Sequence, residues 1–197
     1  STLTTFSNLV GSETLSVSGS GSVSSTNVGA GKTVTPGTLA LTNGTGSASN
    51  YSISSANFDI TQRPLTLVGS KTYDGNTTIQ GSQITTFTNI VGSETLSVAG
   101  SGSVSSANVG NAKNLSTSGL SLVDNSGLAS NYSIASASSN ITQRPVNLSG
   151  SRAYDSTRTA SGSDLSFTNI VSGETLGLTG SGVLDSPAAG GRTIVNT

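Results

Sequence analysis

The chain has 197 residues and a net charge of −1, and it contains no Cys, His, Met or Trp. Only 9% of its residues are charged, whereas Ser and Thr together make up about a third. The lack of Cys excludes disulfides, zinc–thiolate sites and thiol chemistry. Without His and Cys, the usual general base and the best nucleophile of enzymes are missing. We therefore expect no enzymatic activity and no cofactor.

The eight Lys and Arg residues are scattered along the chain. Nucleic-acid binding requires clustered basic residues, and a membrane-spanning helix requires about 20 consecutive apolar residues, so we expect neither nucleic acid nor membrane insertion. Disordered chains combine low hydrophobicity with high net charge, whereas this chain has little charge and regularly spaced Val, Leu and Ile. We expect a folded protein with thin cores. So little charge also favours an extracellular location over a cytosolic one.

From the N-terminus onward, the chain repeats with a period of about 81 residues. The segment FSNLVGSETL begins at Phe6 and returns at Phe87 and Phe167, at successive distances of 81 and 80 residues. The other repeated positions are Asn50 and Tyr51, which return as Asn131 and Tyr132, and Tyr73, Asp74 and Gly75, which return as Tyr154, Asp155 and Ser156. A fixed period of this kind indicates modules arranged in tandem.

The repeat divides the chain into three parts. Residues 1–62 are the C-terminal part of one module, residues 63–143 are a complete module, and residues 144–197 are the N-terminal part of a third. Both ends cut through a module, so we expect Ser1 and Thr197 to be the edges of a window on a longer chain.

Apolar residues alternate with Ser and Thr through most of each module. Such pairs, taken in chain order, are Leu39 and Leu41, Leu65 and Leu67, Leu96 and Val98, Leu120 and Leu122, and Tyr132 and Ile134. A period of two predicts strands with one face toward a core, and Gly, Asn and Ser clusters between them predict turns. The fold class is therefore all-β (mainly β), with six or seven short strands per module. We expect a β-grasp-like sheet or an immunoglobulin-like sandwich, with the modules arranged as an extended rod.

One window has a weak helical pattern. Phe87, Ile90 and Val91 could share a face of a single turn at residues 89–94. A loop with buried anchors explains the same pattern equally well.

The carboxylates are the remaining candidates for chemistry. Glu13, Glu94 and Glu174 occupy equivalent positions, and so do Asp74 and Asp155. Paired carboxylates can hydrolyse glycosides, and converging oxygens can bind calcium, but no calcium-loop pattern is present. We favour structural roles, in which the glutamate closes a turn and the aspartate caps one.

The sequence ITQRP marks the boundary between modules. Pro64 and Pro145 follow Arg63 and Arg144. Proline fixes its own φ, keeps the preceding residue extended and donates no ladder hydrogen bond, which suits the start of a strand. We predict a stiff joint at these four residues, with no room for a flexible linker.

Several motifs, in order, resemble one known family. These are Tyr73-Asp74-Gly75, the segment FTNIVGSETLSVAGSGSVSSANVG, the Gly-x-x-Lys pattern of residues 110–113, the Asn131-Tyr132 pair and the closing ITQRP. Together they are similar to the YDG repeat module, which belongs with the MBG-type modules of large bacterial surface adhesins, including filamentous exoproteins exported by two-partner secretion. The resemblance implies β-rich tandem modules that hold an adhesive region away from the bacterial surface, and it implies no catalytic or cofactor residues.

The third copy departs from the pattern. Ser156 stands where Gly75 stands, and DSPAAGGR replaces SSANVGNAK. We infer that a positive φ is not strictly required at this position and that the third loop is free to differ in shape.

These features favour a structural stalk or filament segment of an extracellular adhesin, for cell-surface attachment or biofilm cohesion. Its partners would be the neighbouring modules of the same chain. One alternative is a module that binds a surface glycan or exopolysaccharide. Against it, seven of the eight Tyr and Phe residues occupy repeated positions, as core residues do. The other alternative is a filament subunit that associates with copies of itself by strand complementation, because cut modules leave open strand edges.

Overall fold

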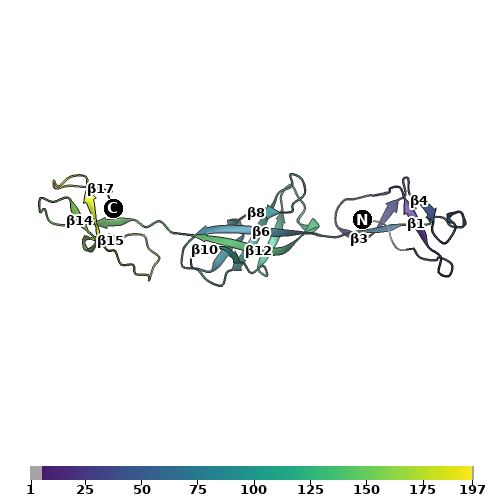
Figure 1. Cartoon of the computed structure of the whole chain (residues 1–197), viewed down its shortest axis with the longest axis horizontal. Helices are drawn as coiled ribbons and strands as arrows, with labels where there is room; N and C mark the ends of the chain where they lie inside the picture. Colours follow the sequence, from purple (N-terminus) through teal and green to yellow (C-terminus); the bar gives the residue numbers. More distant parts are fainter. Residues whose placement is uncertain (1–5, 197) are drawn as a thin grey trace.

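The computed structural model describes residues 6–196, which form seventeen strands and four single-turn 3₁₀ helices. The strands gather in three groups along the chain, and the longest ones, β6 and β12, lie in the middle group (Figure 1). The predicted fold class is therefore confirmed as mainly β, built from several small sheets. Ser1 and Thr197, the expected edges of the window, lie outside the described residues.

The middle group has seven strands and corresponds to the predicted complete module, residues 63–143. Its strands are β6 (Arg63–Thr72), β7 (Thr78–Gln80), β8 (Ile84–Thr88), β9 (Leu96–Ser103), β10 (Gly110–Asn114), β11 (Leu120–Asp124) and β12 (Tyr132–Thr142), and its 3₁₀ turns are η2 (Gly81–Gln83) and η3 (Ala129–Asn131). They form a four-stranded sheet in the order β10-β12-β6-β8 and a three-stranded sheet in the order β11-β9-β7. Seven strands match the upper end of the predicted number.

The first and last strands of this module are parallel neighbours. In their register Arg63 faces Tyr132 and Thr72 faces Thr142, with one irregularity after Ile134. The other strand pairs of the module are antiparallel. An immunoglobulin-like sandwich has antiparallel sheets, so the central parallel pair departs from that alternative.

One apolar core joins the two sheets of the middle module. Along β6 the buried residues alternate with exposed ones, because successive side chains of a strand point to opposite faces. Leu65 and Leu67 are fully buried against Ile79 of β7, and the core continues with Leu96 of β9 and Ile141 of β12. The module is therefore a two-layer sandwich whose central strands are β6 and β12.

The first part of the chain repeats the second half of this module. Its strands are β1 (Leu15–Ser18), β2 (Ser22–Val23), β3 (Gly29–Thr35), β4 (Ala40–Asn43) and β5 (Asn57–Ile60), with the 3₁₀ turn η1 (Ala48–Asn50). β1 pairs with β4, and β3 pairs with both β2 and β5. β5 is equivalent to the end of β12 but has only 4 residues, compared with 11 in β12.

The third part repeats the first half of the module. Its strands are β13 (Leu148–Gly150), β14 (Thr159–Ser161), β15 (Leu165–Phe167), β16 (Ser181–Leu184) and β17 (Ile194–Asn196), with the 3₁₀ turn η4 (Gly162–Asp164). β13 pairs with β15, and β16 pairs with β14 and β17. β13 is equivalent to the middle of β6.

Residues 89–94 form a loop rather than a helical turn. Phe87 and Ile90 are partly buried against the core, whereas Val91 is 49% exposed. The backbone N–H of Glu94 donates to the carbonyl of Val91 at 3.1 Å. The loop alternative is therefore correct. Over the described residues, no helix is long and apolar enough to cross a membrane.

Candidate functional site at the module junctions

The Tyr-Asp-Gly loop begins where β6 ends, and a buried lysine closes it. Lys71 faces the core side of β6 and is 6% exposed. Its ammonium group donates to the Asp74 carboxylate at 2.7 Å and to the carbonyls of Asn76 and Thr78 at 2.7 and 3.0 Å. A buried charge requires such partners. Lys71 therefore holds the loop in one shape.

Asp74 caps the turn, as predicted for its residue type. Its carboxylate accepts the backbone N–H of Asn76 at 2.9 Å, and the intervening Gly75 has a φ of +79°. This is an Asx turn, and its left-handed residue favours glycine. The hydrogen bond from Lys71 and that from the Asn76 backbone lower the pKa of Asp74 below its ordinary value.

The equivalent loop of the third module keeps the same Asx turn, which corrects one inference from the sequence. Ser156 has a φ of +61°, so a positive φ is retained without glycine. The Asp155 carboxylate accepts the backbone N–H of Thr157 at 2.9 Å and its hydroxyl at 2.8 Å. The Asx turn demands this backbone, and a short polar side chain tolerates it. Hydrogen bonds from Thr157, followed by that from Arg152, lower the pKa of Asp155 to about 2.

A tyrosine and a glutamate pair in each of the first two modules. The Tyr51 hydroxyl donates to Oε2 of Glu13, and the Tyr132 hydroxyl donates to Oε2 of Glu94. The hydrogen bond to Glu13 is the main reason why the pKa of Tyr51 is raised. Burial, followed by the bond to Glu94, raises the pKa of Tyr132. The glutamates thus anchor tyrosines, in line with the predicted structural role.

The side chain of Asn131 forms hydrogen bonds that connect the first and middle modules. Asn131 ends η3, directly before Tyr132. Its Oδ1 accepts the backbone N–H of Val28 at 2.9 Å, and its Nδ2 donates to Oδ1 of Asn27 at 3.0 Å. Nearby, Nε2 of Gln62 donates to the carbonyl of Ser130 at 3.2 Å. The equivalent Asn50 ends η1 in the first module.

The Tyr-Asp-Gly loop itself connects the middle and third modules. The Tyr73 hydroxyl donates to Oε1 of Glu174, which is the main reason why the pKa of Tyr73 is raised. A Cβ atom built on Gly75 would lie 2.9 Å from Cγ1 of Val171. The backbone of the loop therefore approaches the third module more closely than a side chain would allow.

A groove lies beside this contact. Its lining residues are Asp74, Gly75 and Asn76 of the loop with Arg144, Ile170, Val171 and Ser172 of the third module. The groove has one acidic and one basic lining residue, so it has no dominant charge. It is part of the junction between the two modules.

The arginines and prolines of ITQRP lie next to the junctions but contact their own modules. Arg63 and Pro64 are the first two residues of β6, whereas Arg144 and Pro145 precede β13. Arg63 donates from Nε to the Asn89 carbonyl at 2.6 Å, and Asn89 Nδ2 donates to the Pro64 carbonyl at 2.8 Å. Arg144 contacts the equivalent Asn169 carbonyl at 2.7 Å. These bonds fasten the start of each module to its own loop.

Two features of the junctions escaped the sequence analysis. The first is the pairing of the tyrosines with Glu13, Glu94 and Glu174. The glutamates recur with the same period as the tyrosines, and this shared period was the signal in the sequence that could have revealed the pairing. Tyr154 was expected in a core, like the other recurring aromatic residues, but it is 68% exposed. Tyr73, in contrast, packs partly against the core of the middle module, and its hydroxyl donates to Glu174.

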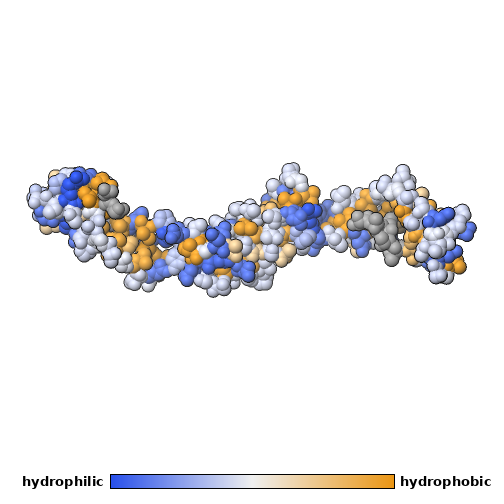
Figure 2. Space-filling model, viewed as in Figure 1, coloured by the Kyte–Doolittle hydropathy of each residue, from blue (hydrophilic) through white to orange (hydrophobic). Residues whose placement is uncertain are grey.

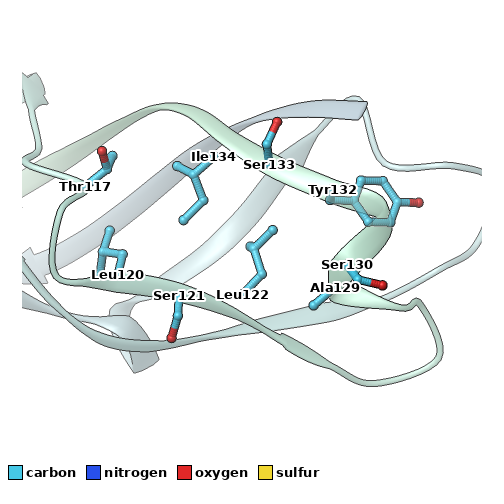
Figure 3. A pocket seen from close by; sticks show the side chains of 9 residues that line it. All are labelled: Thr117, Leu120, Ser121, Leu122, Ala129, Ser130, Tyr132, Ser133 and Ile134. Atoms are coloured by element: carbon cyan, nitrogen blue, oxygen red, sulfur yellow. The ribbon is translucent and has the colours of Figure 1, made fainter. Parts of the chain in front are cut away.

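A shallow depression lies between β11 and β12 of the middle module. Leu120, Leu122 and Ile134 point into it, with Ser and Thr residues around them and Tyr132 at one end (Figure 3). Tyr132 is 3% exposed and its hydroxyl is occupied by Glu94, so it offers no stacking surface. The depression contains no carboxylate or basic residue that could act on a substrate.

The described residues contain no group of three or more His, Cys, Asp or Glu side chains that could hold a metal ion. Hydrophilic and hydrophobic residues are interspersed over the face shown in Figure 2. The contacts of Tyr73 with Glu174 and of Asn131 with Asn27 and Val28 are suited to holding successive modules together.

The comparisons with known proteins agree with the motifs at the junctions. Residues 1–58 and 60–140 each match the model of the YDG domain. The two matched segments cover most of the chain and include Tyr73, Asp74 and Gly75. No curated protein and no solved structure matches the chain.

Proposed function

Because this chain belongs to the YDG domain family, we propose that it is a structural stalk segment of an extracellular bacterial adhesin, built as a rod of tandem modules. The rod would project an adhesive region for cell-surface attachment or biofilm cohesion. Its role is mechanical, and it has no catalytic residues in this proposal.

The parallel pairing of β6 with β12 is the observation that supports a stalk best. The chain begins the module at Arg63 and leaves it after Thr142, and the register places these residues at opposite ends of the strand pair. Ten residues of strand, at about 3.3 Å each, separate the two points by about 30 Å. A module of this kind advances the chain with every copy.

The same pairing suits a load-bearing role. Tension along the chain pulls the start of β6 and the end of β12 in opposite directions. The ladder between them is then loaded in shear, so its hydrogen bonds resist together. Pulling the two strands apart from the same end would break the bonds one after another.

Single-molecule pulling tests this proposal, and the absence of native Cys allows handles at chosen residues. In one variant, Gln62→Cys and Gln143→Cys load the ladder in shear. In the matched variant, Asn76→Cys and Gln143→Cys load it from one end. We expect a several-fold higher rupture force in shear. Equal forces for the two directions would contradict a load-bearing module.

The glycan-binding alternative predicts saturable binding of the full chain to a glycan array. The depression of Figure 3 is a candidate cavity for a glycan, but its aromatic residue is buried. We therefore expect no saturable signal. Saturable binding that is lost in a Leu122→Asp variant would replace the spacer role with a binding role.

A further inference from the structure

The Tyr-Asp-Gly loop of the middle module is fixed from within its own module. Lys71 binds the Asp74 carboxylate and two backbone carbonyls of the loop, and the backbone N–H of Tyr73 donates to the carbonyl of Thr142 at 2.9 Å. The Asx turn at Asp74 adds a third restraint. None of these bonds involves the third module. The shape of the loop therefore does not depend on the module that it contacts.

Two parts of this fixed loop face the third module. The hydroxyl of Tyr73 donates to Oε1 of Glu174, and the backbone of Gly75 faces Val171. Both partners belong to one turn, in which the backbone N–H of Glu174 donates to the carbonyl of Val171 at 3.1 Å. A preformed loop thus meets a preformed turn, and such a contact costs little conformational entropy.

The third module shows that the Asx turn itself does not require glycine. Ser156 has a φ of +61° at the position of Gly75, and the Asp155 carboxylate still accepts the backbone N–H of Thr157. The Ser156 hydroxyl donates to the carbonyl of Asp155, the kind of local hydrogen bond that lets a short polar side chain adopt this backbone. The turn alone therefore does not explain the glycine at position 75.

The contact with the third module, in contrast, excludes a side chain at position 75. A Cβ built on Gly75 would lie 2.9 Å from Cγ1 of Val171 and 4.0 Å from its Cβ. Carbon atoms in favourable contact lie about 3.5–4.0 Å apart, so the first distance is a clash and the second is not. The obstacle is thus one methyl group of the following module.

We propose that the Tyr-Asp-Gly loop is a preformed docking element for the following module, and that Gly75 determines how closely the loop docks rather than whether its turn forms. Tyr73 supplies the directional hydrogen bond of the contact. Lys71 is a positioning residue, which acts through the loop. The proposal concerns the contact between neighbouring modules, and it holds whether or not the modules bear load in an adhesin.

A requirement of the turn and a requirement of the contact predict different substitutions. If the turn alone required glycine, Gly75→Asn would be mild, because asparagine adopts a positive φ more readily than most residues. If the contact requires glycine, Gly75→Asn and Gly75→Ser both disturb the junction, because each adds a Cβ. Removal of Cγ1 by Val171→Ala should then make room for that Cβ.

Distances between spin labels test the proposal in the full chain, which has no native Cys. Thr86→Cys and Ser166→Cys place the labels at equivalent exposed positions of the middle and third modules. Double electron–electron resonance then reports the distribution of distances between the two modules. We expect one narrow peak for the labelled chain and an additional broad, undocked population with Gly75→Ser or Gly75→Asn.

The compensating variant separates the contact from the turn. Gly75→Ser combined with Val171→Ala should have no larger undocked population than Val171→Ala alone. Additive effects of the two substitutions would mean that the serine acts through strain in the turn, and would overturn the role of Gly75. Ser156→Gly is the reciprocal control, because it changes the same loop position outside this junction, and it should leave the distribution unchanged.

Two further variants test the other residues of the docking element. Tyr73→Phe retains the ring and should raise the undocked fraction about three- to tenfold, the effect of one hydrogen bond. Lys71→Met should also raise it, because the loop loses its internal restraint. Arg152→Met, the equivalent change in the third module, should lower stability without changing the distribution.

Circular dichroism establishes that each variant is folded before the distances are compared. A distribution with Gly75→Ser that equals that of the labelled chain would overturn the role of Gly75. If Gly75→Ser does not fold, the turn requires glycine at this position after all, and the role of Gly75 is overturned as well. An unchanged distribution with Tyr73→Phe would overturn the role of Tyr73, and one that changes equally with Arg152→Met and Lys71→Met would overturn that of Lys71.

Discussion

Residues 63–75 and 144–156 have closely similar sequences but different structures. In the middle module this segment forms β6, a strand of 10 residues, whereas in the third part it forms β13, a strand of 3 residues. Leu67 is fully buried, and the equivalent Leu148 is 39% exposed. The difference follows from the partner strand, since β6 pairs with both β12 and β8, and β13 pairs with β15 alone. Strand length here depends on the neighbouring strand more than on the local sequence.

The first and third parts of the chain differ from the middle module for the same reason. β5 and β13 are the two strands that would correspond to the central parallel pair, and they belong to different partial modules. The Asx turn, in contrast, is alike in the middle module and the third part. The Asx turns of Asp74 and Asp155 retain their hydrogen bonds because those bonds are made within the loop itself.

The largest effect is expected in the core of the middle module. Leu67→Ala should lower the free energy of unfolding by about 2–5 kcal/mol, because it leaves a cavity at a fully buried site. Leu148→Ala should lower it by only about 0.5 kcal/mol or less, as at exposed positions. Urea unfolding followed by circular dichroism measures both. Equal losses would mean that β13 is as well packed as β6.

The next effect concerns the buried cation beneath the loop. Lys71→Met should cost about 1–3 kcal/mol, because the carbonyls of Asn76 and Thr78 lose their donor. Arg152→Met removes the equivalent cation, whose side chain is 19% exposed and can exchange its partners for water. The Arg152 variant should therefore lose less. Thermal unfolding of the two variants side by side decides this, and a larger loss for Arg152→Met would contradict it.

Substitution of the boundary proline should alter the arrangement of modules more than their stability. Pro64→Gly frees the backbone at the start of β6 and should cost about 0.4–1 kcal/mol. We expect a wider distribution of inter-module angles in small-angle scattering with an unchanged circular dichroism spectrum. Pro145→Gly, in a segment outside any strand, is the control for the second junction. An unaltered distribution in both variants would show that proline does not stiffen the joint.

The smallest effect is a pH dependence of the third loop. The pKa of Asp155 is about 2 in the folded chain, below the value of about 3.9 in unfolded chains. A carboxyl with a lowered folded-state pKa stabilises the fold above pH 3.9, and this contribution is lost as the pH falls from about 4 to about 2.

The variant Asp155→Asn should therefore unfold at a lower temperature than the unaltered chain at pH 5, and the difference should shrink toward pH 2. Asp74→Asn should behave in the same direction, because the pKa of Asp74 is also lowered. A difference that stays constant across this range would mean that the charge of Asp155 is not involved.

The alternation of apolar residues was sufficient to predict much of the middle module. Leu65, Leu67, Leu96 and Val98 were expected on the core side of strands and are buried there. The caps by aspartate were also predictable, because an Asx turn uses residues within three positions of each other. The inference that the third loop does not require a positive φ was wrong, since Ser156 keeps a positive φ in place of glycine.

By itself the sequence determined the period, the all-β class and the turns, because these depend on contacts between residues that are close in the chain. Only the tertiary structure decided which strands are neighbours. The pairing of β6 with β12 joins residues about 70 positions apart, and the bond from Tyr73 to Glu174 spans 101 positions. Alternation reports which side of a strand is buried, but it contains no information about the strand or module on the other side.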